Sequence, residues 1–228
     1  MDSLHPASSQ LESASGRPPK VSVCMAAYNH EKFIAQAIES VLMQQTNFDY
    51  ELVIGEDCST DGTRGIVMAY RDKHPDRIRL LLHEKNVGMH QNSAQTFKAC
   101  RGQYIAFLEG DDYWISPQKL QMQADFLDNH PDFTFCFSNV LVVDEDRVKP
   151  ELFYKTPMKT VYGLEDLLTG NFIHTPSVMA RNGVCDELPE WHYRMPMGDW
   201  AFYLLNAQRG PFGYINEVLA AYRKHAGG

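Results

Sequence analysis

The sequence predicts an α/β fold in which helices alternate, in a Rossmann-like manner, with the strands of a central, mostly parallel sheet. Two observations carry this prediction. Short apolar runs rich in β-branched and aromatic residues recur along the chain, and each is separated from the next by a polar loop and an amphipathic stretch. We expect strands at residues 21–27, 50–55, 78–83, 104–108 and 133–137.

Helices are expected where apolar residues recur at a spacing of three or four. Asn29 is the expected cap of the first helix, and Ser59 or Thr60 that of the second, which should end before Pro75. Further on, the alternation becomes less regular. The remaining expected elements are helices at 34–42, 89–99, 120–127 and 199–207 and a strand at 214–222.

Composition excludes several classes of protein. The formal net charge of the 228 residues is -8, without a run of Lys or Arg, so we expect no nucleic-acid partner. The five cysteines are scattered singly, which argues against a disulfide framework or a structural zinc site.

Residues 1–19 read as a disordered tail. Because no apolar run is long enough to span a bilayer, we expect a cytoplasmic protein, at most peripherally attached to the inner face of the membrane.

Three carboxylates follow the expected strand 104–108 directly: Glu109, Asp111 and Asp112. Like charges this close repel one another unless a cation neutralises them, so the segment predicts a bound Mn²⁺ or Mg²⁺. Such an ion could stabilise a diphosphate leaving group as a Lewis acid. The alternative is a solvated acidic turn.

Two other loops follow strands in the same way. Ala27, Tyr28 and Asn29 combine small residues with an aromatic ring on which a flat base could stack, although the same residues would also suit a simple tight turn. Asp57 could accept a hydrogen bond from a base, or it could only cap the next helix. Neither loop has the glycine spacing of dinucleotide-binding or phosphate-binding loops.

Taken together, these loops resemble the family-two glycosyltransferases, which have the GT-A fold. The resemblance covers residues 19–225 and rests on four segments in the family's order and spacing: 21–29, 56–63, 86–88 and 104–112. It implies a single domain at 20–228, with a nucleotide-binding half at 20–115 and an acceptor-side half at 116–228.

The resemblance also implies roles for individual residues. Asp111 would be a direct metal ligand, with His225 as a further metal or phosphate contact and Arg223 near the diphosphate. Glu109 stands where the family usually has an aspartate, so it would contact the ribose or the metal. The residues implied around the donor nucleotide, with uracil as the favoured base, are Ala27, Tyr28, Asn29, Asp57, Asn86, Glu109, Gly110 and Arg223.

Inverting members of the family need a carboxylate that removes the proton of the acceptor hydroxyl. Asp199, at the start of a late helix, matches this position, although an aspartate there is also a common helix cap. Trp114, His174 and Trp200 are candidate acceptor contacts. The alternatives are burial in the core for Trp200, which begins a helix, and an ordinary hydrogen-bonded histidine for His174.

The expected function is therefore inverting transfer of a sugar from a nucleoside diphosphate sugar, with a UDP-sugar favoured, to a hydroxyl of a sugar or glycolipid acceptor. The product would belong to a polysaccharide, lipopolysaccharide or other glycoconjugate. One alternative is a catalytically silent homologue that only binds nucleotide sugars. Another is a sugar nucleotidyltransferase, which would need a glycine-rich loop where Ala26, Ala27 and Tyr28 stand. Relatives commonly continue beyond residue 228, so truncation also stays open.

Overall fold

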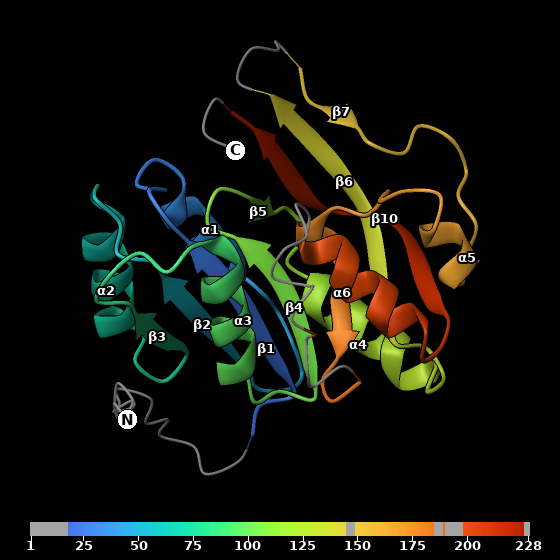
Figure 1. Ribbon diagram of the computed structural model, residues 1–228, viewed down its shortest axis with the longest axis horizontal. Coiled ribbons are helices and arrows are strands. Elements are labelled where there is room, and N and C mark those ends of the chain that lie inside the picture. The colour runs from blue at the N-terminus through green and yellow to red at the C-terminus, as the bar shows by residue number, and fades with distance from the viewer. Residues whose placement is uncertain (1–17, 145–148, 185–188, 190–197, 226–228) are drawn as a thin grey trace.

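The computed structural model describes residues 18–144, 149–184, 189 and 198–225. Its centre is a ten-stranded sheet with the order β3-β2-β1-β4-β9-β6-β10-β5, in which β7 also pairs with β6 and β8 with β10 (Figure 1). The long strand pairs are parallel, and each antiparallel pair joins only two or three residues. The mixed α/β architecture with a mostly parallel sheet is confirmed.

The strands are β1 (Val21–Ala27), β2 (Tyr50–Glu56), β3 (Ile78–Leu82), β4 (Tyr104–Glu109), β5 (Tyr113–Trp114), β6 (Phe135–Asp144), β7 (Glu151–Leu152), β8 (Val161–Tyr162), β9 (Met179–Arg181) and β10 (Phe212–Lys224). The helices are α1 (Ile34–Leu42), α2 (Thr63–Lys73), α3 (Met89–Ala99), α4 (Lys119–Asn129), α5 (Leu164–Leu167) and α6 (Gly198–Ala207), with a short 3₁₀ helix η1 (Thr175–Ser177).

The two faces of β1 differ in side-chain size. Val21, Val23 and Met25 are fully buried in the main core, where the apolar residues of α1 and α4 also lie. Because side chains alternate along a strand, Cys24 and Ala26 point to the opposite face, which α3 covers. The small residues on this second face leave room between sheet and helix.

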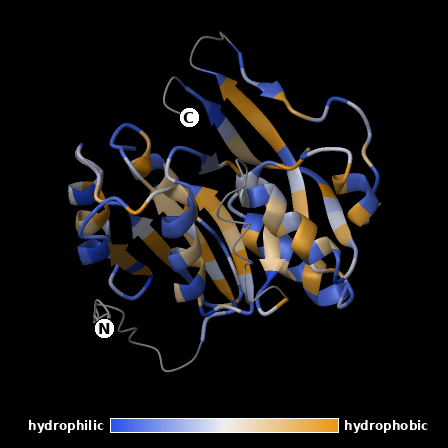
Figure 2. Cartoon of the chain, in the orientation of Figure 1, coloured by the Kyte–Doolittle hydropathy of each residue, from blue (hydrophilic) through white to orange (hydrophobic). Residues whose placement is uncertain are grey.

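The second half of the sheet is built on β6 and β10, which run parallel over most of their length. The short strand β9 pairs antiparallel with both β4 and β6 and so connects the two halves into one sheet. Figure 2 shows hydrophobic residues along much of β6 and hydrophilic residues in many surrounding loops. A second core of mostly aromatic side chains lies between this part of the sheet and α6.

Some expectations for this fold were wrong. Asn29 does not cap the first helix, because α1 begins at Ile34 and Asn29 takes a left-handed conformation with φ 56°. Neither Ser59 nor Thr60 caps α2, whose N-cap is Gly62. The last predicted strand is longer than expected, since β10 runs from Phe212 to Lys224.

The expected tail at 1–19 falls almost entirely outside the described residues. Among the helices that are described, none has the length and apolar character needed to cross a membrane.

Candidate functional site

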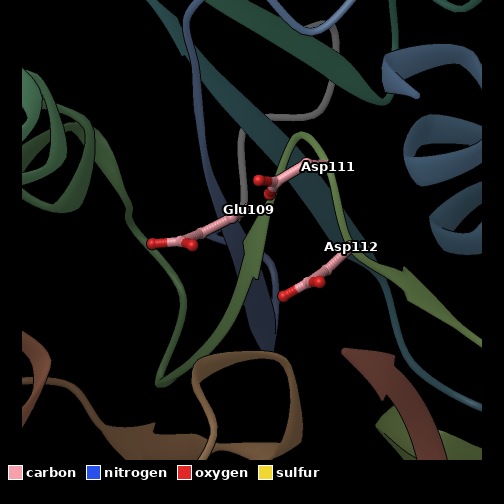
Figure 3. Close-up of side chains that lie close together, drawn as sticks. All are labelled: Glu109, Asp111 and Asp112. Atoms are coloured by element: carbon pink, nitrogen blue, oxygen red, sulfur yellow. The ribbon is translucent and has the colours of Figure 1, made fainter. Parts of the chain in front are cut away.

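The carboxyl ends of β1, β2 and β4 meet at one edge of the sheet, where ligands bind in open α/β folds. Glu109 is the last residue of β4, and Asp111 and Asp112 lie in the turn that leads to β5 (Figure 3). Gly110 holds this turn against the end of β1, because its amide donates to the carbonyl of Ala26 at 3.0 Å.

The close approach at Gly110 leaves no room for a side chain. A Cβ atom at this position would lie 2.6 Å from Nδ1 of His30 and 2.9 Å from Cδ1 of Ile34. Glycine therefore lets the acidic turn pack directly on the start of the first helix.

The three acidic side chains form one cluster, in which one oxygen of each lies within 4.8 Å of the others. Oδ1 of Asp111 and Oδ2 of Asp112 are buried and have no hydrogen-bond partner in the described part of the chain. Burial and the neighbouring charges of Asp111 and Asp199 raise the pKa of Glu109 to about 8, and burial with Asp111 and Glu109 also raises that of Asp112. Such a set of crowded, unpartnered carboxylate oxygens fits a hard divalent cation.

The end of β10 reaches this cluster from the other half of the sheet. The backbone amide of Arg223 donates to Oδ1 of Asp112 at 2.7 Å, and its Nε donates to the carbonyl of Asp111 at 2.8 Å. Nε2 of His225 lies 3.0 Å from Oδ2 of Asp111. The structure thus brings together the acidic turn, Arg223 of β10 and His225, which directly follows β10.

His30 is a site residue that sequence reasoning missed. Its Nε2 lies 3.7 Å from Oδ2 of Asp111, and its Nδ1 is buried without a partner among the described residues. Burial lowers its pKa below the ordinary value. Its position in the loop after the first strand, at the carboxyl edge of the sheet, was the signal that could have found it.

The loops expected to hold the base lie beside this cluster. Tyr28 is 40% exposed, whereas Ala27 before it is buried. Asn29 is tied to the loop after β2, because its side-chain oxygen accepts the amide of Thr60 at 2.8 Å. These contacts fix the two loops side by side.

Asp57 is buried and organises the segment after β3. Its Oδ1 accepts the amide of Val87 at 2.7 Å and its Oδ2 accepts that of Gly88 at 2.9 Å. Asn86, the residue before this pair, is exposed. Asp57 therefore does not cap α2, and it positions the loop in which Asn86 lies.

Asp199 and Glu109 both line a cleft of about 440 Å³. Oδ2 of Asp199 accepts hydrogen bonds from Nδ2 of Asn171 at 3.1 Å and from the hydroxyl of Thr175 at 3.4 Å. Burial raises its pKa, and the bonds from the amide of Trp200, from Asn171 and from Thr175 oppose this rise. A carboxylate with a raised pKa is suited to accept a proton near neutral pH.

Of the three candidate acceptor contacts, only His174 lines the cleft. Its ring stacks on Tyr222, and burial followed by the nearby charge of Lys224 lowers its pKa to about 4. The expectation for Trp114 was wrong: its side chain is 1% exposed and its Nε1 donates to the carbonyl of Pro176 at 3.0 Å, so its ring has no face for a sugar.

Trp200 does not line the cleft either. Its Nε1 donates to the carbonyl of Leu167 at 3.0 Å, and its ring packs against the second core. Its role is therefore to hold α6 against α5, in agreement with the alternative of a core residue.

Comparison with known proteins decides the family. The family model described as glycosyl transferase family 2 matches residues 22–187, which include the acidic turn and the loops around it. The chain belongs to glycosyl transferase family 2.

Curated relatives agree with this family. An uncharacterized protein of Mycobacterium tuberculosis is 37% identical over 209 residues, covering 91% of this chain and 60% of its own length. TuaG of Bacillus subtilis, provisionally named as a glycosyltransferase of teichuronic acid biosynthesis, is 31% identical over 90% of this chain and 79% of its own length. The family-two chain thus spans about 60% of the length of the first of these relatives.

A solved structure confirms the GT-A fold of this family-two chain. S. aureus TarS 1-349 is 25% identical with a TM-score of 0.69, and the match covers 90% of this chain and 60% of TarS 1-349. TarS has been solved in complex with UDP and with UDP-GlcNAc.

Proposed function

We propose that this chain transfers a glycosyl group from a nucleoside diphosphate sugar to an acceptor hydroxyl with inversion at the anomeric carbon, and that residues 20–228 act as one domain in this reaction. One observation supports the proposal above all others. Glu109 of the acidic cluster and Asp199 line the same cleft, and Asp111 and Asp112 beside Glu109 carry unpartnered oxygens, so a leaving group and a base could act on one sugar.

Asp111, Glu109 and His225 are the residues that would hold a divalent cation, Mn²⁺ or Mg²⁺. When bound, such an ion neutralises the charge that develops on the departing diphosphate. The guanidinium of Arg223 lies beside the same turn, where its Nε donates to the carbonyl of Asp111. Its positive charge would attract the phosphates while its hydrogen bonds keep the turn in place.

The donor nucleotide would lie over the loops after β1 and β2. The exposed ring of Tyr28 offers a face for the base, and the carboxylate of Asp57 keeps lone pairs beyond its two amide contacts. Uracil fits this arrangement because its imino group could donate a hydrogen bond to the carboxylate of Asp57. The solved complexes of TarS with UDP and UDP-GlcNAc support a uridine donor here.

Asp199 would act as the general base. Its carboxylate removes the proton of the acceptor hydroxyl, and that oxygen forms a bond to the anomeric carbon as the bond to the diphosphate oxygen breaks. Because attack comes from the face opposite the leaving group, the configuration at the anomeric carbon is inverted. His174, which lines the same cleft, would contact the acceptor, for which we propose a sugar or glycolipid of a glycoconjugate.

Calorimetry tests the donor side directly. We expect UDP to bind in the presence of Mn²⁺ and to bind much more weakly in its absence, and we expect UDP-sugars to be hydrolysed slowly. Identification of the anomer formed on an acceptor by NMR then tests inversion. Cation-coupled binding without any donor hydrolysis or transfer would instead support the silent homologue. If no nucleoside diphosphate associates with the protein with either cation, the proposed function is wrong.

A further inference from the structure

Three aromatic rings form an apolar wall in the cleft beside Glu109 and Asp199. Phe97 of α3, Phe107 of β4 and Phe202 of α6 all line this cleft. The ring centroids of Phe107 and Phe202 are 5.2 Å apart, those of Phe97 and Phe202 5.6 Å, and those of Phe97 and Phe107 6.2 Å. The three rings therefore pack as one cluster, although they come from three different elements.

Small residues keep the space in front of this wall open. Cys24 pairs with Phe107 and Ala26 with Glu109 in the register of β1 and β4, so the four side chains share one face of the sheet. Ala94 of α3 also lines the cleft. A large residue at any of these positions would fill the space that the rings border.

The wall lies within reach of a sugar bound for transfer. Phe107 precedes Glu109 by two residues on the same face of β4, a separation of about 7 Å along the strand, which is comparable with the width of a pyranose ring. An anomeric carbon placed between the acidic cluster and Asp199 would thus direct ring substituents toward the apolar wall.

We propose that this wall selects a donor whose sugar carries a methyl group, either that of an acetamido substituent or that of a 6-deoxy sugar. The inference rests on the proposed function and names its donor class. The lining of the cleft also includes polar residues, Ser93, Asn171 and Thr175 among them, but the three rings of the wall pack against one another. A hydroxyl held against the aromatic rings would lose its hydrogen bonds to water, whereas a methyl group there gains burial.

Two matched pairs of donors test this selection. Calorimetry with Mn²⁺ compares UDP-glucose with UDP-N-acetylglucosamine, and dTDP-glucose with dTDP-6-deoxyglucose. We expect the methyl-bearing donor of at least one pair to bind about fourfold or more tightly than its hydroxyl partner. The first pair measures the preference for an acetamido group, and the second measures the preference for the methyl group of a 6-deoxy sugar. Equal affinities within both pairs would overturn the inference.

Variants at Ala94 test whether the wall is the cause. Ala94→Leu should weaken the binding of every sugar nucleotide by about tenfold and leave bare UDP unchanged, while Ala94→Ser, which is too small a change to disturb folding, should reduce the preference for the methyl-bearing donor. Lys98→Leu, on the exposed side of the same helix, is the matched control and should change neither. Wild-type donor preference in both Ala94 variants would refute a role of the wall.

The nucleotide alone separates this inference from the proposed function. If bare UDP binds with Mn²⁺ but the donors show no preference, only the selection by the apolar wall is wrong. If no nucleoside diphosphate binds at all, the proposed function fails and the selection fails with it.

Discussion

Nε2 of His225 lies 3.0 Å from Oδ2 of Asp111, so the end of β10 and the turn after β4 meet at a single carboxylate. Nε2 of His30 approaches the same oxygen at 3.7 Å from the loop after β1. Asp111 is therefore the point at which three separate elements converge.

Asp111→Asn should weaken the Mn²⁺-dependent binding of UDP by about 10- to 100-fold, because an amide is a poorer ligand for a hard cation than a carboxylate. Calorimetry at fixed Mn²⁺ measures the change. Asp72→Asn, at an exposed position on α2, is the control and should bind as the wild type does. If Asp111→Asn binds UDP with the same Mn²⁺-dependent affinity as the wild type, Asp111 is not a ligand of the metal.

Asp199→Asn should lower kcat by about 10²- to 10⁴-fold, because the amide cannot accept the proton of the acceptor hydroxyl. The affinity for UDP should stay the same, since Asp199 is not among the residues proposed to hold the nucleotide or the cation. Asp166→Asn provides a matched control: Asp166 accepts the amide of Gly163 at the start of α5, outside the cleft. If Asp199→Asn turns over normally in a folded protein, Asp199 is only a helix-terminal residue.

Thr175→Val should shift the acid limb of the kcat profile to higher pH. The hydroxyl of Thr175 donates to Asp199 and favours its charged form, so its loss should raise the pKa of Asp199 further above the ordinary value. A general base works only when deprotonated, and the rate therefore falls as the pH drops through that pKa. The measurement is kcat against pH for both proteins, and coincident profiles would argue against Asp199 as the base.

Asp57→Ala should destabilise the fold by about 2–4 kcal/mol, because it leaves the amides of Val87 and Gly88 without their acceptors. Urea denaturation followed by circular dichroism measures the loss. The exposed Glu84→Ala, in the same connection, should change stability by less than about 0.5 kcal/mol. Equal stabilities of the two variants would show that the hydrogen bonds from Val87 and Gly88 to Asp57 contribute nothing to the stability of the fold.

Gly110→Ala should weaken cation-dependent nucleotide binding, because the added Cβ would lie 2.6 Å from Nδ1 of His30 and force the acidic turn to move. Gly65→Ala is the matched control. Its Cβ would meet nothing within 4 Å on an exposed face of α2, so it should stabilise the protein by about 0.5–1 kcal/mol. Calorimetry and thermal unfolding of both variants separate the two effects.

Much of the first half of the fold could be predicted from the sequence. The bounds of β1 and α3 agree with the expected strand 21–27 and helix 89–99. β1 is a continuous apolar run, whereas α3 is mostly polar and was indicated by the glycines that flank it, Gly88 and Gly102. The short strands β5 and β9 were not predicted. They consist of two and three residues, and only pairing with distant strands makes them part of the sheet.

The placement of the candidate residues was predictable where they stand at the end of a strand or just after it, as Glu109, Asp111 and Asp57 do. The role of a residue was harder to predict from the sequence where the orientation of its side chain decides that role. Trp114 is close in sequence to the acidic turn, yet its side chain points into the core and its indole bonds to Pro176. His30 carries no motif of its own, and its position beside Asp111 depends on the packing of the turn at Gly110 against the loop after β1.

The parallel pairing of β10 with β6 has a consequence for the order in which the parts of the candidate site can form during synthesis. The strands β1, β2 and β4 can associate as soon as the first 109 residues exist, whereas the contacts of Arg223 and His225 with the acidic turn need residues more than 110 positions later. During synthesis, a nascent chain that lacks β10 would carry the acidic turn without its contacts to Arg223 and His225. The hydrogen bonds from Arg223 to Asp111 and Asp112 therefore form only after β10 has been made and has paired with β6.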